Sequence, residues 1–294
     1  MKKNPFVQII LWLATMAVLT LFVMGAWLLI ADAQSTASLK WLQFAQTTAT
    51  FLLPPILCAY IWSDNHRPFT WLRMDTRPDG FLCLIAIGIM ICAIPAINLL
   101  ADLNNRIVFP AALSALEQQL RAMEEAAAVL TERFLKADNF GGLLINIGLM
   151  ALLPALSEEL SFRGTLQQIL SYSPKDGLTV KRSYSVSGLT AKRSIAVWLT
   201  AIIFSAIHMQ FFGFIPRMLM GAMFGYIFLW SGSLWIPIIM HFTNNSLAVI
   251  AYYTFGQNSS ADTIGTGATW WLGVLSLILT SLGLLIFYRR THKG

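Results

Sequence analysis

The stretch IGLMALLPALSEELSFRG (residues 147–164) decides the fold, because an apolar run leads directly into charged residues. Its first part is as apolar as a membrane span, and Glu158, Glu159 and Arg163 follow at once. An ionised group inside a span costs about 2.5–3.5 kcal/mol even on a lenient insertion scale, so such groups usually face a protein interior. The stretch therefore predicts a helix within a bundle of membrane helices.

The composition of the whole chain agrees with a membrane location. Of 294 residues, 56% are hydrophobic and 12% are charged, and the mean hydropathy is +0.65. The charged share is about half that of an average soluble domain. The net charge of +6 is scattered through short loops without a basic face, so we expect no nucleic-acid partner. The three cysteines have no metal-ligand spacing and are expected to be buried apolar residues.

Eight apolar runs are each long enough to cross about 30 Å of hydrocarbon. They lie near 5–31, 41–63, 81–101, 140–156, 195–212, 214–230, 234–253 and 269–288. We predict an all-α, polytopic membrane helix bundle with about eight transmembrane helices. The first run ends near Ala31-Asp32-Ala33, which resembles a signal-peptide cleavage site. Its apolar part is much longer than the ~7–15 residues of such signals, so we interpret it as an uncleaved anchor.

The distribution of Lys and Arg predicts the orientation. With the N-terminus inside, thirteen loop cations lie in the cytoplasm and five on the opposite side, as the positive-inside rule requires. The cytoplasmic cations are Lys2, Lys3, Arg67, Arg73, Arg77, Lys175, Lys181, Arg182, Lys192, Arg193, Arg289, Arg290 and Lys293, and the others are Lys40, Arg106, Arg121, Arg133 and Lys136. An even number of spans also places the C-terminus in the cytoplasm.

Two segments between the spans have internal order. After Pro110, apolar residues recur at steps of three and four, which predicts an amphipathic helix outside the membrane. They are Leu113, Leu116, Leu120, Met123, Ala127, Leu130 and Phe134. This helix can lie on the membrane surface, pack on the bundle or pair with a second copy, and packing is the default. Residues 177–183 and 188–194 repeat almost the same basic sequence, which favours a solvated loop.

The remaining polar residues of the spans are spaced for chemistry. Glu159 and Arg163 are four residues apart, so they share a helix face and can pair, whereas Glu158 points about 100° away. Phe204 and His208 have the same spacing on another run. We therefore expect Glu158 to be the free carboxylate, with an imidazole and an aromatic ring facing it.

A third run carries His241 and Asn245, again four residues apart. Three helices then each deliver a polar face to a common site. The motifs in order are Glu158-Glu159-x-x-x-Arg163, Phe204-x-x-x-His208 and His241-x-x-x-Asn245. In this order they resemble the CPBP family of intramembrane glutamic endopeptidases, which contains the CAAX prenyl proteases and the bacterial bacteriocin-processing or Abi proteins. The resemblance covers roughly residues 140–250.

The resemblance implies a mechanism, a partner and a place in the cell. Glu158 and His208 would hold and activate a water, and His241 and Asn245 would stabilise the oxyanion. Glu159, Arg163 and Phe204 would support them. The substrate would be a peptide or protein at the membrane, and the location would be a bacterial plasma membrane with both termini cytoplasmic; the oligomeric state is unknown.

The resemblance also divides the chain into three segments. Residues 1–139 would hold the first three transmembrane helices and the extracytoplasmic amphipathic helix. Residues 140–253 would form the CPBP-like catalytic core. Residues 254–294 would hold the last transmembrane helix and a basic cytoplasmic tail.

Each motif also has an ordinary structural explanation. Glu158, Glu159 and Arg163 are compatible with a cytoplasmic helix end, since the apolar run stops near Leu156. His208 alone is compatible with an interfacial histidine, and Asn245 with a hydrogen bond between helices. Gly221 and Gly225 favour a close-packing surface. A membrane scaffold or a bacteriocin-immunity-type binding protein therefore stays an alternative to an enzyme.

Other protease chemistries lack their motifs. The sequence contains no His-Glu-x-x-His, no Gly-x-Ser and no Gly-x-Gly-Asp, which disfavours the usual zinc, rhomboid-like serine and presenilin-like aspartyl proteases. Zinc on Glu158, His208 and His241 is the alternative, since these are competent ligands. A Glu–His pair that activates water needs no metal, so we expect no cofactor.

Overall fold

The computed structural model describes residues 4–29, 35–171, 191–256 and 263–292. In these ranges the regular structure is helical, without a strand. This confirms the all-α membrane bundle. The Ala31-Asp32-Ala33 site and residues 177–183 lie outside the described residues, as does the start of 188–194.

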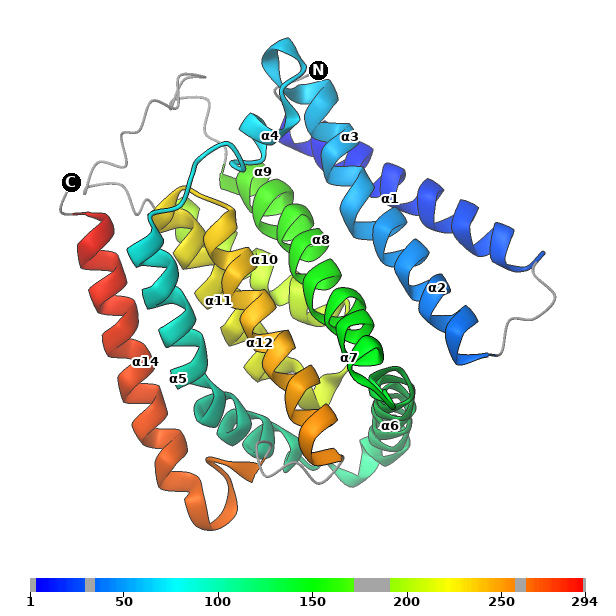
Figure 1. Ribbon diagram of the computed structural model, residues 1–294, viewed down its shortest axis with the longest axis vertical. Coiled ribbons are helices and arrows are strands. Elements are labelled where there is room, and N and C mark those ends of the chain that lie inside the picture. Colours follow the sequence, from blue (N-terminus) through cyan, green and yellow to red (C-terminus); the bar gives the residue numbers. More distant parts are fainter. Residues whose placement is uncertain (1–3, 30–34, 172–190, 257–262, 293–294) are drawn as a thin grey trace.

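The helices form a bundle with an N-terminal group at one side (Figure 1). The N-terminal group consists of α1 (Pro5–Trp27), α2 (Thr36–Thr47), η1 (Thr48–Leu52), α3 (Leu53–Trp62), η2 (Asp64–His66) and α4 (Pro68–Trp71). Next come α5 (Gly80–Asn105), η3 (Ala111–Leu113) and α6 (Ser114–Leu135). One long helix follows as α7 (Phe140–Asn146), η4 (Ile147–Leu152), α8 (Leu153–Ser161), η5 (Phe162–Gln167) and α9 (Gln168–Ser171). The last elements are α10 (Ala191–Ala206), η7 (Phe211–Gly213), α11 (Phe214–Ser231), α12 (Trp235–Phe255), η9 (Gly267–Thr269) and α14 (Trp270–Thr291).

Six of these helices are long and apolar enough to cross a membrane. They are Pro5–Trp27, Thr36–Trp62, Gly80–Asn105, Phe140–Ser171, Phe211–Ser231 and Gly267–Thr291. The predicted spans 195–212 and 234–253 correspond to α10 and α12, which are not among the six. The number eight therefore stays a prediction. In Figure 1 the beginning of α1 and the end of α14 lie toward the same end of the bundle, as an even number of crossings requires.

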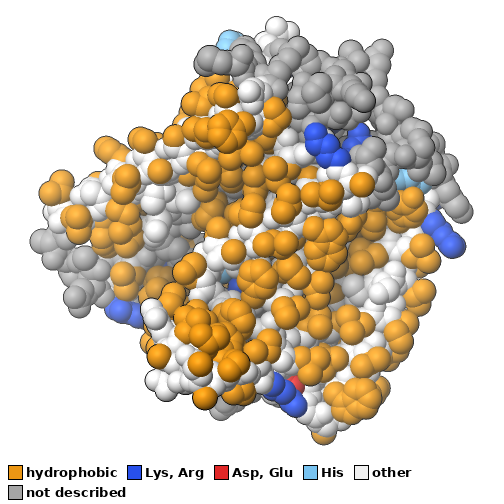
Figure 2. Space-filling model, turned by 180° about the vertical axis from the view of Figure 1, so that it is seen from behind, with side chains coloured by type: hydrophobic (Ala, Val, Ile, Leu, Met, Phe, Trp, Pro, Cys, Tyr) orange, Lys and Arg blue, Asp and Glu red, His pale blue; other side chains and the backbone are white. Residues whose placement is uncertain are grey.

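The surface of the molecule fits a lipid environment. Figure 2 shows apolar side chains over most of one face, with Lys and Arg mainly near its margins. Large apolar residues such as Leu21, Phe22 and Ile286 are more than half exposed. Contiguous apolar surface of this extent is rare on soluble monomers.

The long helix Phe140–Ser171 differs from the prediction in length. The apolar run suggested a span that ends at 156, but the helix continues for fifteen further residues. A π-helical turn, η4, ends directly before Leu153 and Pro154. Proline lacks the N–H that an α-helix needs, and a π turn changes the hydrogen-bond register locally. Glu158, Glu159 and Arg163 thus lie well inside a helix, so their interpretation as a helix end was wrong.

The predicted span 195–212 was also wrong at its C-terminal end, because α10 ends at Ala206. Met209 has a φ of 54°, a left-handed conformation that an α-helix excludes. The chain turns here into α11, which begins at Phe214. His208 therefore lies in a turn and not in a helix. Hydropathy alone does not mark this turn, since the residues on both sides of it are apolar.

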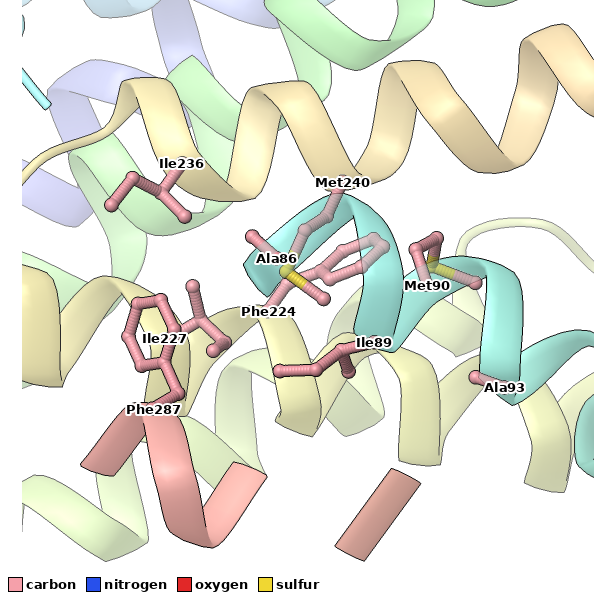
Figure 3. Close-up of a cluster of buried hydrophobic side chains, with 9 residues drawn as sticks. All are labelled: Ala86, Ile89, Met90, Ala93, Phe224, Ile227, Ile236, Met240 and Phe287. Atoms are coloured by element: carbon pink, nitrogen blue, oxygen red, sulfur yellow. The ribbon is translucent and has the colours of Figure 1, made fainter. Parts of the chain in front are cut away.

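One buried cluster joins the middle and the end of the chain (Figure 3). Ile89 and Met90 of α5 meet Phe224 of α11, Met240 of α12 and Phe287 of α14. In Figure 1 α14 runs beside α5. Phe224 and Met240 lie next to residues of the candidate site, so this core fixes the helices that carry it.

The amphipathic helix predicted behind Pro110 exists as α6. It lies at the end of the bundle beside α7 (Figure 1). Phe134 near its C-terminus is buried, and Asn146 of α7 donates a 2.7 Å hydrogen bond to the carbonyl of Leu135. The default alternative, packing on the bundle, therefore describes this helix.

Candidate active site

Glu159 and Arg163 form the buried ion pair that their spacing predicts. Nη1 of Arg163 lies 2.7 Å from Oε1 of Glu159, and both side chains are 0% exposed. Nη2 of Arg163 donates a 2.9 Å hydrogen bond to the carbonyl of Gly221 in α11. Its guanidinium also lies 4.7 Å from the ring centre of Phe204 and 5.4 Å from that of Phe224. A buried charge is stable only with such partners.

A second contact repeats this pattern one turn later. Gln167 donates a 3.0 Å hydrogen bond to the carbonyl of Gly225. Arg163 and Gln167 are four residues apart, as are the two glycines that accept from them. The long helix and α11 are thus joined by two equivalent bonds. Gln167 was not predicted, although the series 159, 163, 167 continues the same helix face.

The two glycines permit this close approach. A Cβ at Gly221 would lie 3.2 Å from Phe204 and 3.3 Å from Nη2 of Arg163. A Cβ at Gly225 would lie 2.8 Å from Val197. The prediction that these glycines form a close-packing surface is confirmed. The structure adds that their carbonyls accept the bonds from the long helix.

His241 connects α12 to the same ion pair. Its Nδ1 lies 2.9 Å from Oε1 of Glu159, and its Nε2 lies 3.9 Å from Oε2 of Glu158. The ring of Phe224 lies against the imidazole, with 5.4 Å between centroids. A carboxylate oxygen can only accept, so Nδ1 carries the hydrogen. His241 therefore bridges the two glutamates, with Nε2 directed toward Glu158.

The two neighbouring glutamates have different surroundings. Glu159 is fully buried and bound to two partners, whereas the Glu158 side chain is 15% exposed. Among the described residues, the side chain of Glu158 has no hydrogen bond and no ion pair with Lys or Arg. Glu158 is thus the free carboxylate that the sequence predicted.

His208 is oriented by its own chain. Its Nδ1 lies 2.8 Å from the carbonyl of Phe204, so Nδ1 is the protonated nitrogen and Nε2 is free in the neutral ring. The Phe204 ring lies near both imidazoles, with centroids 5.1 Å from that of His208 and 6.2 Å from that of His241. Arg217 of α11 has an electrostatic interaction with both His208 and Glu158. Arg217 was not predicted, because its position has no helical spacing to either residue.

Asn245 is the predicted residue that the described contacts do not join to the others. It lies on α12 one turn after His241, and its Oδ1 accepts a 3.1 Å hydrogen bond from Asn244. The structure therefore brings together Glu158, Glu159, Arg163, Phe204, His208 and His241 through contacts, and Asn245 only through its helix.

The described residues contain no group of three or more His, Cys, Asp or Glu side chains that could hold a metal ion. Whether zinc binds to Glu158, His208 and His241 is a question for a chelator experiment.

Comparison with known proteins covers the part of the chain that holds all these residues. No curated protein and no solved structure matches the chain. A family model matches residues 140–247, from the start of α7 to the middle of α12. Its description is type II CAAX prenyl endopeptidase Rce1-like. Residues 140–247 therefore form an Rce1-like domain, in agreement with the CAAX protease family that the sequence motifs resemble.

Proposed function

We propose that this protein is an intramembrane glutamic endopeptidase with Glu158 as its general base. The Rce1-like domain at residues 140–247 supports intramembrane CAAX-protease activity in general, with a lipid bilayer around the enzyme and a peptide substrate at the membrane. The observation that supports the glutamic mechanism most is the contrast between Glu159, fully buried and paired, and Glu158, which has no hydrogen bond in the described structure. A carboxylate without a hydrogen bond, 3.9 Å from the imidazole of His241, is suited to accept a proton.

In this mechanism Glu158 and His208 hold the attacking water between them. Glu158 takes one proton from the water while the oxygen forms a bond to the carbonyl carbon of the scissile peptide. The same proton then passes to the leaving nitrogen as the C–N bond breaks. The free Nε2 of His208 is an acceptor for the second hydrogen of the water, and this fixes the direction of attack.

His241 and Asn245 would stabilise the negative charge on the carbonyl oxygen. Because Nδ1 of His241 already donates to Glu159, Nε2 can donate to an oxyanion only when the ring is an imidazolium cation. The carboxylate of Glu159 supports that charge. Donors fixed in a site without bulk water contribute several kcal/mol to the stability of a developing oxyanion.

We place the enzyme in a bacterial plasma membrane, with eight spans and both termini in the cytoplasm. A tag at residue 260 would then be labelled from outside the cell, and a tag after Gly294 would not. Equal labelling at both places would refute this topology.

No metal takes part in this mechanism. A tight chelator should leave the cleavage rate unchanged. Inhibition by the chelator that zinc reverses would instead assign zinc to Glu158, His208 and His241.

The test of the mechanism compares two adjacent substitutions of the same chemistry. Glu158→Gln keeps the size of the side chain but cannot accept a proton, so the rate of cleavage of a peptide library should fall by about 10²–10⁴-fold. The variant should insert and fold normally, which excludes a scaffold role if activity is lost. Glu159→Gln is the matched control, because it should lower stability as well as rate. Cleavage by Glu158→Gln at the wild-type rate would refute Glu158 as the base.

A further inference from the structure

The turn that carries His208 belongs to neither of the helices beside it. α10 ends at Ala206 and α11 begins at Phe214. Met209 adopts a φ of 54°, and the His208 backbone N–H makes only a 3.3 Å bond to Ser205. The imidazole bonds to Phe204 of its own chain, and two elements from outside also hold the turn that carries it.

One of these elements is the end of α5. Nδ2 of Asn104 donates a 3.0 Å hydrogen bond to the carbonyl of Phe211. Its Oδ1 accepts a 3.3 Å hydrogen bond from the backbone N–H of Ile215. The Asn104 side chain is buried and spans the end of the turn and the start of α11.

The other element is α6, which contacts the turn through two charged side chains. Oε2 of Glu124 accepts a 3.2 Å hydrogen bond from the backbone N–H of Phe212. The guanidinium of Arg121 lies 3.9 Å from the centre of the Phe212 ring, and this ring is only 4% exposed. The turn is thus held through its backbone and its aromatic side chain by one helix outside the membrane.

Arg121 is itself held in place. Its Nε donates a 2.9 Å hydrogen bond to Glu117, and its Nη2 donates a 3.1 Å bond to the carbonyl of Ile107. Glu117 also accepts a 2.8 Å bond from the N–H of Phe109, whose ring lies 5.1 Å from that of Phe211. The first half of α6 and the segment before it are therefore held together by hydrogen bonds, and both contact the turn.

Glu124 also belongs to the charge distribution of the site. It interacts electrostatically with Arg217, which in turn interacts with Glu158 and His208. Its neighbour Glu125 is exposed and makes no contact of this kind in the described part of the chain. The two acids therefore differ in contact with the turn, although they are adjacent on the same helix.

We propose that α6 is a positioning element of the active site and that Glu124 is its positioning residue. The hydrogen bond from Phe212 to Glu124 fixes the turn, and the turn places the imidazole of His208 against Phe204. This inference rests on the proposed function, in which His208 holds the attacking water. It gives the helix outside the membrane a part in catalysis without contact with the reacting atoms.

The kinetic test uses the two adjacent glutamates. Glu124→Ala should lower kcat by about 10–100-fold with little change in KM, since small misplacements of a catalytic group have effects of this size. Glu124→Gln keeps an acceptor for the Phe212 N–H and should restore kcat to within a few-fold of wild type. Glu125→Ala should match wild type. Equal kcat for Glu124→Ala and Glu125→Ala, or no recovery with Glu124→Gln, would overturn the proposal.

A second test needs no activity and covers the case in which no peptide is cleaved. Diethyl pyrocarbonate modifies neutral imidazoles, and mass spectrometry measures each histidine separately. The rate at His208, relative to the exposed His66, should rise in Glu124→Ala and stay unchanged in Glu125→Ala. A constant ratio would show that α6 does not hold the turn. An inactive wild-type enzyme with a changed ratio would refute the proposed function and leave the positioning contact in place.

Phe212→Leu should raise the same ratio, because it removes the ring beneath Arg121 and keeps an apolar side chain.

Discussion

Two Glu–Arg pairs in this protein have the same spacing and almost the same length but opposite surroundings. Arg163 lies 2.7 Å from Glu159 inside the long membrane helix, with both side chains 0% exposed. Arg121 lies 2.9 Å from Glu117 on α6, with side chains 40% and 15% exposed. The helical spacing creates both pairs, and the environment decides their energetic importance.

The two Glu–Arg pairs differ in the additional hydrogen-bond partners that each one has. Oε1 of Glu159 also binds His241, and Arg163 also donates to the carbonyl of Gly221. Burial favours protein partners for the polar atoms of the pair, and those that it finds on α11 and α12 make it the centre of a network that joins three helices. Glu117 and Arg121 bond only to backbone and side chains near α6, and water solvates the rest. A buried pair can therefore organise an active site, whereas the exposed pair adjusts the position of one helix.

The largest expected effect is the loss of the buried cation. Arg163→Leu leaves Glu159 charged and buried without its arginine partner, so the free energy of unfolding should fall by about 3–5 kcal/mol. Arg121→Leu should have a several-fold smaller effect, since water replaces the lost partner. Denaturant unfolding of both variants in detergent measures the ratio. Equal losses would mean that burial does not distinguish the two pairs.

Next in size is the neutralisation of one buried glutamate. Glu159→Gln weakens the bonds to both Arg163 and His241 and should lower stability by about 1.5–3 kcal/mol, the range for hydrogen bonds to charged groups. Glu158→Gln should leave stability almost unchanged, because Glu158 has no such bond in the described structure. Thermal unfolding of the two variants side by side provides the measurement. A larger loss for Glu158→Gln would contradict the assignment of Glu159 as the structural carboxylate.

A methyl group added at Gly221, whose carbonyl accepts a hydrogen bond from Arg163, should lower stability by a somewhat smaller amount. Gly221→Ala places a Cβ 3.2 Å from Phe204 and 3.3 Å from Arg163, and such overpacking typically lowers stability by about 1–3 kcal/mol. Gly88→Ala is the control, because its Cβ would meet nothing within 4 Å on the exposed face of α5. Gly88→Ala should be neutral or slightly stabilising, since alanine favours helix. A neutral Gly221→Ala would show that α11 can move away from the long helix freely.

The sequence predicted what depends on local spacing. It located the helices, the pairing of Glu159 with Arg163, the isolation of Glu158 and the close-packing glycines. It did not predict the bond between His241 and Glu159 or the interaction of Arg217 with the site. These connect helices that are distant in sequence, and helical periodicity contains no information about the rotation of one helix relative to another.

The turn after α10 was missed for a different reason. The apolar run continues past Ala206, so hydropathy placed His208 within a helix. The left-handed Met209 ends that helix, and the contacts from Asn104 and Glu124 stabilise the turn. The end of this helix is thus determined by tertiary contacts and not by a local stop signal.

The smallest expected effect concerns pH and the exposed pair. The N–H of Phe109 and the guanidinium of Arg121 both donate to Glu117 and lower the pKa of this carboxyl below its ordinary value. A lowered pKa in the folded state means a stabilising contribution that is complete above the ordinary Glu pKa of about 4.3 and disappears as the pH falls through the lowered value. Wild type should therefore have a slightly higher Tm than Glu117→Gln at pH 7, and the difference should shrink as the pH falls below the ordinary Glu pKa. Glu125→Gln removes an exposed acid that has no hydrogen bond or ion pair in the described part of the chain, and it should show no such difference. A difference in Tm between wild type and Glu117→Gln that stays constant from pH 7 to pH 3 would mean that the charge of Glu117 does not hold α6 in place. The comparison between the two pairs would then rest on the buried pair alone.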